Sequence, residues 1–406
     1  MRTEWGSQEV WIQGIRRRKV RQPLTFSTEG LKEEKKQMTV KDKRHREVIS
    51  KIKLLMSDVA KDLMVERTMP VLDVPKVGYD NTIWSDEKRM LTIGSKTVQV
   101  SPDSTKKIPT FSQYLVMANA IRKLLDEEME STIRGMYYAT LTSLGDEDGA
   151  KQKFWNSQEN SDDAIKAIEL LTSVPREEFS VTSKPKGMIS GPITLRVGGD
   201  IIDCNLGSRA TSQLIPTNIR DVEIVNVKAD FVMVVEKDTV LNNIRKSGFI
   251  QKYNSILMTG SGEPDRATRM MVKTLNEEWK KPVVIFADAD PWGLGIALRY
   301  KIGSESLSYD SDRLVTPDAK VLGMMFSDIY EYNIPEVARL AGSDEDINRA
   351  NDMKKKPWLK DRQWQKELNL FIQRKEKCEL DAFFKHGFRF LAETYLPRKL
   401  RGAGLI

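Results

Sequence analysis

The sequence is poor in the residues on which many small folds and catalytic sites depend. Its 406 residues include two cysteines, Cys204 and Cys378, and two histidines, His45 and His386, and the two residues of each kind lie far apart. This scarcity argues against a disulfide scaffold, a zinc finger and a Cys–His protease. A catalytic metal ion would therefore have to be bound by carboxylates.

Long apolar runs are missing as well. A membrane-spanning helix needs roughly 18 or more apolar residues in a row, and the longest candidates, Phe231–Val235 and Val283–Ala287, are far shorter. The first 30 residues lack the basic-then-apolar pattern of a secretion signal. With 40% apolar and 30% charged residues, we expect a water-soluble, cytoplasmic protein with an apolar core and no membrane partner.

Basic residues are in excess, and the excess is local. The chain has 65 basic and 58 acidic residues, a formal net charge of +7, of which residues 1–54 alone contribute 15 and 7. The rest of the chain is therefore close to neutral. Clusters such as Arg16–Lys19 attract phosphate backbones without reading base sequence, although a solvated tail would carry the same charges. We assign residues 1–41 to a basic N-terminal arm.

The next part, residues 42–165, is predicted as a domain of helices with one hairpin. Segments with apolar residues at three- and four-residue spacing predict helices at 42–69, at 111–125 and from 132 onward. A hairpin is expected around Asp86-Glu87. Helices with a small hairpin suit a winged-helix module, which docks on DNA.

The second half of the chain alternates apolar runs with amphipathic segments. Turn signals such as Gly191-Pro192 predict a β-rich connection at 166–226. Beyond it, strands are predicted at Phe231–Val235, Ile256–Thr259 and Val283–Ala287, and helices at Val240–Ile250, Arg266–Trp279 and Trp292–Tyr300. This alternation predicts a mostly parallel sheet covered on both faces. The expected fold class is α/β with several domains, and residues 227–406 form the sheet domain with its C-terminal helices.

Three carboxylates directly follow predicted strands. Glu236 follows the first of these strands, and Asp288 and Asp290 follow the third. Ligands bind at the carboxyl ends of the strands in an open parallel sheet, and oxygen ligands of this kind suit Mg²⁺. One such acid alone would more often be a helix N-cap, which Asp290 before Pro291 could provide. For the three acids together we favour a metal site.

A second group lies on the helix predicted from residue 132. Arg134 and Tyr138 are four residues apart and therefore share one helix face. A tyrosine hydroxyl has a pKa near 10 and needs a neighbouring cation, metal or base to act as a nucleophile. A guanidinium one turn away can also bind a phosphate. Without the metal site, the same residues would more often belong to an ordinary amphipathic helix.

The segment Thr259–Arg269 is a glycine-containing turn between a strand and a helix, with Arg266 and Arg269 one helical turn apart. Backbone amides in such a turn can bind a phosphate. The G-x-x-x-x-G-K-[ST] pattern of a nucleotide-binding loop is absent from this segment and from the rest of the chain. We therefore expect that the chain does not hydrolyse ATP by itself.

At these residues the sequence resembles the A subunits of archaeal topoisomerase VI, the type IIB topoisomerases whose relatives include the meiotic double-strand-break protein. The resemblance covers roughly residues 42–400. It is carried by Val234-Val-Glu236-Lys237-Asp238, Thr259-Gly…Gly262-x-Pro-Asp265-x-Ala-Thr-Arg269, Asp288-Ala-Asp290-Pro-x-Gly and Thr316-Pro-Asp-Ala-Lys320. It implies a winged-helix (CAP-like) domain that carries a nucleophilic tyrosine, followed by a Toprim domain that carries the metal acids.

The resemblance also implies roles for single residues. The family's Arg-x-x-Tyr-Tyr pattern places the attacking tyrosine at Tyr138, while Gly135 stands where the family usually has an acid. Tyr138 would form a 5′-phosphotyrosine link, with Arg134 on the same phosphate. Mg²⁺ would be bound by Glu236, Asp288 and Asp290, and DNA would be contacted by Lys237, Arg266 and Arg269.

The implied enzyme is a DNA topoisomerase that relaxes or decatenates double-stranded DNA. This chain would form a homodimer and join a separate ATPase B subunit in an A2B2 heterotetramer, at the nucleoid of an archaeal cell. Two alternatives remain: a Toprim nuclease that uses metal-activated water, and a break-forming transesterase that does not reseal the DNA. A non-catalytic DNA-binding protein is a third, against which the co-occurrence of Tyr138 and the three acids argues.

Overall fold

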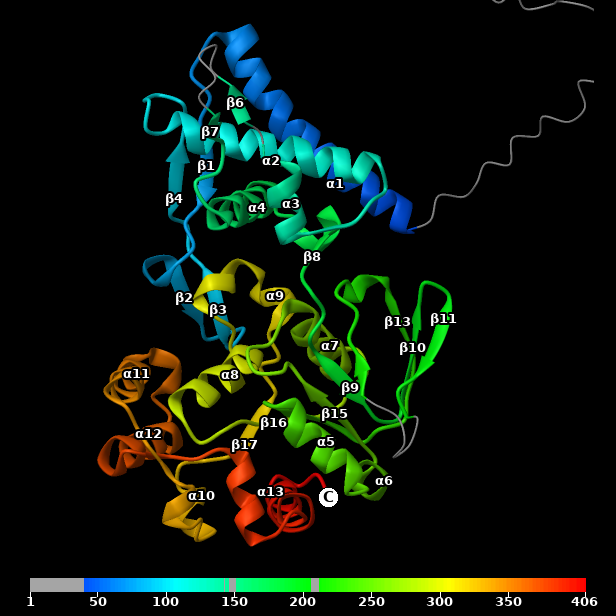
Figure 1. Ribbon diagram of the computed structural model, residues 1–406, viewed down its shortest axis with the longest axis vertical. Coiled ribbons are helices and arrows are strands. Elements are labelled where there is room, and N and C mark those ends of the chain that lie inside the picture. The colour runs from blue at the N-terminus through cyan, green and yellow to red at the C-terminus, as the bar shows by residue number, and fades with distance from the viewer. Residues whose placement is uncertain (1–39, 142, 146–150, 206–211) are drawn as a thin grey trace, which may run out of the picture. The chain divides into compact units, whose positions relative to one another are not determined.

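The structure is a computed structural model, which describes residues 40–141, 143–145, 151–205 and 212–406 (Figure 1). The chain divides into two units, residues 1–43 and residues 44–406, and the architecture below is that of the second. Residues 1–39 of the predicted basic arm lie outside the described residues.

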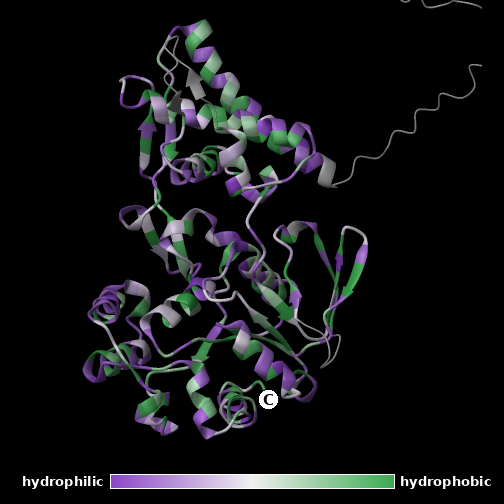
Figure 2. Ribbon diagram, in the orientation of Figure 1, coloured by the Kyte–Doolittle hydropathy of each residue, from purple (hydrophilic) through white to green (hydrophobic). Residues whose placement is uncertain are grey.

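The first part of the described chain is a helical domain. Its helices are α1 (Val40–Lys61), α2 (Ile108–Asp126), α3 (Ile133–Ala139) and α4 (Gln158–Thr172), which confirms the predicted helices. Hydrophobic and hydrophilic residues alternate along α1 and α2 (Figure 2). The apolar positions build one core that runs from Val48 through Met117, Trp155 and Ile165 to Val181. This core extends beyond the domain boundary predicted at residue 165.

Short strands accompany these helices. They are β1 (Leu72–Pro75), β4 (Thr97–Val100), β5 (Ser131–Thr132), β6 (Ser143–Gly145), β7 (Lys151–Lys153) and β8 (Val181–Thr182). The predicted hairpin is present as β2 (Thr82–Ser85) and β3 (Met90–Ile93), paired antiparallel. It packs against the sheet domain, since the Leu91 amide donates a 2.9 Å hydrogen bond to the carbonyl of Ile302. The winged-helix assignment therefore stays a prediction.

The connection between the domains is rich in strands, as predicted. It contains the antiparallel sheet β11–β10–β13, formed by β10 (Ile193–Val197), β11 (Asp200–Asp203) and β13 (Val222–Val227). Two further strands of this region, β9 (Met188–Ser190) and β12 (Gln213–Leu214), pair antiparallel at the edge of the central sheet.

The central sheet has the strand order β12–β9–β15–β14–β16–β17. Its last four strands in this order are β15 (Ser255–Thr259), β14 (Phe231–Val235), β16 (Val283–Phe286) and β17 (Lys320–Gly323), and β17 forms one edge. These four strands are parallel, so the sheet is mixed, with a parallel centre as predicted. Every residue of β14 and β16 is buried, as expected for apolar runs covered on both faces.

Two apolar cores lie on the sheet. One contains side chains from α5 (Asp238–Lys246), α6 (Phe249–Tyr253) and the C-terminal helices α10 (Asp328–Glu331), α11 (Asp344–Lys355), α12 (Arg362–Arg374) and α13 (Leu396–Gly402). The other contains α7 (Arg266–Glu277), with α9 (Ser311–Leu314) packed beside it. Helix α8 (Pro291–Lys301) contributes to both. In the described ranges, no helix is long and apolar enough to cross a membrane.

Candidate active site

The predicted acids lie at the carboxyl edge of two adjacent strands. Because β14 and β16 are parallel neighbours, the residues that follow them meet. The Asp288 amide donates a 3.0 Å hydrogen bond to Oε2 of Glu236. Asp288 is 5% exposed and Glu236 is half-buried. The sheet topology thus brings together two carboxylates from segments far apart in the sequence.

Burial makes both carboxylates hard to ionise. Burial, followed by the charge of Asp288, raises the pKa of Glu236 to about 7. Burial also raises the pKa of Asp288, although hydrogen bonds from the Leu380 amide and from Lys237 oppose the rise. Carboxylates in this situation are stabilised by a nearby cation.

Asp288 has two partners that the sequence did not indicate. Its Oδ1 accepts a 2.9 Å hydrogen bond from the Leu380 amide, and its Oδ2 lies 2.9 Å from Nζ of Lys237. The same Nζ lies 2.9 Å from Oε2 of Glu379. Lys237, predicted as a DNA contact, is therefore paired with two carboxylates. Glu379 follows β19 (Glu376–Lys377), which pairs with β18 (Leu340–Ala341), and no motif marked it.

Asp290 forms the N-cap of α8. Its Oδ1 accepts hydrogen bonds from the amides of Trp292, at 2.8 Å, and Gly293, at 2.6 Å. The capping role considered from the sequence is thus present at this residue. Gly293 also allows the start of α8 to lie close to Asp288 and Glu236, because a Cβ there would lie 2.6 Å from the Asp288 carbonyl oxygen and 2.9 Å from Oε2 of Glu236.

The donor chemistry of this edge fits a divalent cation. Its carboxylates are hard oxygen ligands. Burial is the main cause of the raised pKa values of Glu236 and Asp288, and a cation would offset that cost. Their present arrangement is not that of a coordination shell: within the part of the chain that the structure describes, no three acidic, histidine or cysteine side chains surround a common point. The edge is occupied instead by the ammonium group of Lys237 and by backbone amides.

The predicted nucleophile lies on α3 and faces solvent, with 56% of Tyr138 exposed. The Thr132 hydroxyl caps this helix by accepting a 2.9 Å hydrogen bond from the Gly135 amide. Nη2 of Arg134 donates to the Tyr138 hydroxyl at 3.4 Å, so the four-residue spacing brings the two side chains together. A side chain at Gly135 would collide with the Ser131 hydroxyl, so an acid there would require Ser131 to move.

Arg134 and Tyr138 form one group, and Glu236, Asp288 and Asp290 form another, which we call the acid edge. Among the described residues, no hydrogen bond or ion pair joins Arg134 or Tyr138 to Glu236, Asp288 or Asp290. A site that uses both groups would therefore need the chain to rearrange or a second copy of it to contribute.

Arg266 and Arg269, which the sequence predicts as DNA contacts, are both buried in this structure. Arg266 is 6% and Arg269 1% exposed. The Arg266 guanidinium donates to both carboxylate oxygens of Glu169 on α4, at 2.5 and 3.0 Å, and to the Tyr309 hydroxyl at 2.7 Å. In this structure neither guanidinium is exposed at the protein surface, where DNA would bind. The partners of Arg266 lie in distant segments, which the sequence pattern did not reveal.

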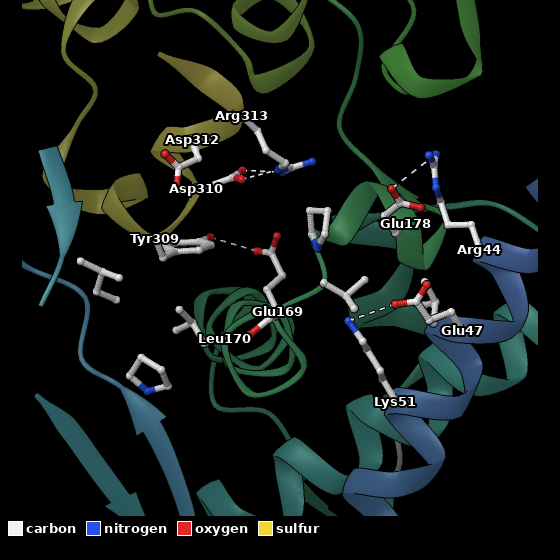
Figure 3. Close-up of a pocket in the computed structure, with 16 residues that line it drawn as sticks. Arg44, Glu47, Lys51, Glu169, Leu170, Glu178, Tyr309, Asp310, Asp312 and Arg313 are labelled. Carbon is white, nitrogen blue, oxygen red and sulfur yellow. Dashed lines mark hydrogen bonds and ion pairs between the residues drawn. The ribbon is translucent and has the colours of Figure 1, made fainter. Parts of the chain in front are cut away.

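The ion pairs around Arg266 join the helical domain to the sheet domain. Glu169 and Glu177 come from the helical domain, Arg266 from α7, and Asp310 and Arg313 from the segment before β17; we call these five residues the domain-joining cluster. A cavity of about 430 Å³ lies beside the cluster, and Figure 3 shows Glu169, Asp310 and Arg313 among its lining residues.

Comparisons with known proteins point to one family. Residues 231–400 match the family described as the Toprim domain of Spo11 and of the topoisomerase 6 A subunit, and residues 109–181 match "Type IIB DNA topoisomerase". The chain is 38% identical to the A subunit of type 2 DNA topoisomerase 6 from Saccharolobus shibatae, over 81% of this chain and 88% of that protein. It is also 38% identical to the corresponding protein of Aeropyrum pernix, over 85% and 91%. Identity to the A subunit of DNA topoisomerase 6 from Arabidopsis thaliana is 31%, over 81% and 74%.

Proposed function

Because the chain belongs to the family of topoisomerase 6 A subunits, we propose that it is the DNA-cleaving subunit of a type IIB DNA topoisomerase and that Tyr138 is its nucleophile. The observation that supports the residue assignment most is the pairing of the exposed Tyr138 hydroxyl with Arg134. A Toprim edge with three acids in the same chain supports it further. The helical domain around α3 would be the winged-helix domain of the family.

The proposed reaction is a transesterification. The Tyr138 oxygen attacks a DNA phosphorus, an O–P bond to tyrosine forms, and the O–P bond to the 3′ oxygen breaks. The break therefore has a 5′-phosphotyrosine and a free 3′ hydroxyl, and attack by that hydroxyl reseals the strand. Arg134 would bind the phosphate through its two forked N–H groups. The exposure of Tyr138 suits a substrate as large as duplex DNA.

Glu236, Asp288 and Asp290 are the residues that would hold Mg²⁺. The ion would supply positive charge next to the phosphate on which negative charge develops. The chain's own contribution is to position the acids at one sheet edge, to keep α8 close through Gly293, and to exclude water from Asp288 by burial.

The proposed assembly is a homodimer with an ATPase B subunit, in an A2B2 arrangement on double-stranded DNA. A dimer explains how two strands are cut by a chain with one nucleophile. It would also allow the tyrosine of one protomer to work with the acids of its partner, since the two groups do not touch within one chain. The proposed location is the nucleoid of an archaeal cell, consistent with the archaeal relatives.

The test is a denaturing trap of covalent protein–DNA adducts. The full chain is incubated with supercoiled DNA, Mg²⁺, its B subunit and a non-hydrolysable ATP analogue. Tyr138→Phe is compared with Tyr137→Phe, which makes the same change on the neighbouring residue. We expect protein attached to 5′ ends with wild type and Tyr137→Phe and none with Tyr138→Phe. Cleavage without attached protein in all three samples would instead identify a Toprim nuclease, and adducts that never reseal would identify a break-forming transesterase.

A further inference from the structure

Lys237 gives the acid edge a cation of its own. Its ammonium lies 2.9 Å from a carboxylate oxygen of Asp288 and 2.9 Å from one of Glu379. The Asp288 side chain is 4% exposed, whereas that of Glu379 is 48% exposed. One ammonium therefore bridges a buried carboxylate, which needs a counter-charge, and a surface carboxylate, which water can also solvate.

The two oxygens of Asp288 are both in use. Oδ1 accepts from the Leu380 amide, and Oδ2 pairs with Lys237. The backbone of Lys237 is anchored as well: it precedes α5, and its carbonyl accepts a 3.1 Å hydrogen bond from the Leu241 amide. The flexible part is the four-carbon side chain. A metal ion that binds Oδ2 must therefore compete with the ammonium group or displace it.

We propose that Lys237 is an internal counter-cation that competes with the divalent metal for Asp288, and that Glu379 retains the ammonium group when the metal takes its place. The proposal rests on the proposed function only in taking Glu236, Asp288 and Asp290 as the metal ligands. Lys237 is then a positioning residue, because it keeps buried acids paired in the metal-free protein and weakens metal binding. A DNA phosphate would add the negative charge that favours the metal, so tight metal binding would await the substrate.

The first test measures Mn²⁺ binding to the full chain without DNA, by the loss of the free-ion electron paramagnetic resonance signal at pH 8.5. We compare wild type, Lys237→Met, the charge-retaining Lys237→Arg and the control Lys228→Met, which removes a charge from an exposed lysine of the sheet domain. At an effective dielectric constant near 20, a unit charge a few ångströms from a divalent ion opposes its binding by well over about a hundredfold. Movement of the ammonium group onto Glu379 relieves most of this repulsion, and we take about tenfold as the least effect that should remain. We therefore expect Lys237→Met alone to lower the dissociation constant by at least that factor.

An unchanged or higher dissociation constant for Lys237→Met would overturn the proposal, as would an equal decrease in Lys228→Met. Circular dichroism confirms that each variant is folded, and Lys237→Gln replaces the methionine variant if that protein does not fold. A second readout is the rise in melting temperature on adding Mg²⁺, which should be larger in Lys237→Met than in wild type, because its buried acids lack another counter-charge.

The role of Glu379 is separated by a double-mutant cycle. Glu379→Gln should weaken Mn²⁺ binding in the wild-type background, because the ammonium group then stays on Asp288. In the Lys237→Met background the same change should have no effect, and weaker binding there would identify Glu379 as a metal ligand instead. None of these measurements involves cleavage, and Tyr138→Phe should bind Mn²⁺ as wild type does. A failed nucleophile assignment and a failed counter-cation are therefore distinguishable.

Discussion

Replacing Arg266 by methionine should strongly destabilise the junction between the two domains. Arg266 is 6% exposed, forms a two-pronged pair with Glu169 at 2.5 and 3.0 Å, and lies 3.5 Å from Glu177 and 3.8 Å from Asp310. Methionine approximates the length of the arginine stem but carries no charge. The substitution would therefore leave a small cavity and a buried Glu169 without its cation, whereas Glu177 and Asp310 would keep Arg313.

The expected decrease in the free energy of unfolding comes from the buried carboxylate that loses its cation. Removing one partner of a buried ion pair costs about 3–5 kcal/mol. By comparison, an exposed pair such as Arg389–Glu393, whose side chains are 74% and 48% exposed, contributes about 0–1 kcal/mol. Arg389→Met is therefore the matched control. The additional change Glu169→Gln removes one stranded charge, so the double variant should be more stable than Arg266→Met by about 1–3 kcal/mol.

The destabilisation caused by Arg266→Met should also depend on pH. Although burial opposes it, Arg266 and its neighbouring arginines hold the pKa of Glu177 below its ordinary value. A lowered folded-state pKa contributes stability above the ordinary pKa, and that stability is lost as pH falls through the folded-state value. In Arg266→Met, Glu177 loses one of the cations that lower its pKa and takes up a proton more readily, so the difference in unfolding free energy from wild type should narrow towards acidic pH.

The assay is urea unfolding followed by tryptophan fluorescence, with each transition fitted separately because the chain has two domains. Limited proteolysis at the 182–188 connection reports whether the junction opens before either domain unfolds. Two results would refute the idea that buried ion pairs stabilise the junction. One is a decrease in unfolding free energy below about 1 kcal/mol for Arg266→Met; the other is additivity of the unfolding free-energy changes of Arg266→Met and Glu169→Gln in the double variant.

Three further predictions concern the core and the acid edge. Trp155→Phe should destabilise the helical domain by about 2–4 kcal/mol in urea unfolding, because buried Trp155 donates a 3.0 Å hydrogen bond to the Thr140 hydroxyl that phenylalanine cannot make. Gly293→Ala should reduce the yield of trapped adducts by at least about tenfold, since a displacement near 1 Å at a catalytic group can cost a hundredfold; an unchanged yield would show that the close approach of α8 is dispensable. The pKa of Glu236 is higher in the folded than in the unfolded protein. As pH rises from the ordinary pKa of glutamate to about 7, the metal-free protein should therefore lose the stability that protonation of Glu236 provides. Over the same range the melting-temperature gain from Mg²⁺ should increase, and a gain independent of pH would contradict a raised carboxyl pKa at this edge.

The strands of the sheet and the position of its acids could be predicted from the sequence. The run Phe231–Val235 is β14 with the same bounds, because continuous β-branched segments of this length are typical of a buried parallel strand. Acids directly after such strands must lie at the carboxyl edge. That β14 and β16 are immediate neighbours did not follow from the pattern, since strand order depends on long-range contacts. The sequence therefore predicted the acid edge, while the sheet topology determined which acids meet.

The roles of the long cationic side chains could not be predicted in the same way. An arginine near the start of an amphipathic helix has the same local pattern whether it faces solvent or, like Arg266, a buried glutamate from another domain. Lys237 beside Glu236 likewise carries no signal for Glu379, which lies on a distant segment. The hairpin at 82–93 was predicted, but its packing on the sheet domain was not, because its residues are compatible with either surface. Local propensity determines the element, and the tertiary structure determines its partner.

Backbone amides also explain how three acids can share one edge before any metal ion binds. Oε2 of Glu236 accepts from the Asp288 amide, Oδ1 of Asp288 from the Leu380 amide, and Oδ1 of Asp290 from the first amides of α8, including that of Gly293. Each carboxylate is therefore held by one oxygen while the other can bind a different partner. Fixed donors of this kind cost no reorganisation when charge develops during a reaction. The capping and the metal-binding interpretations of Asp290 are thus compatible, since the cap fixes the orientation that a ligand would need.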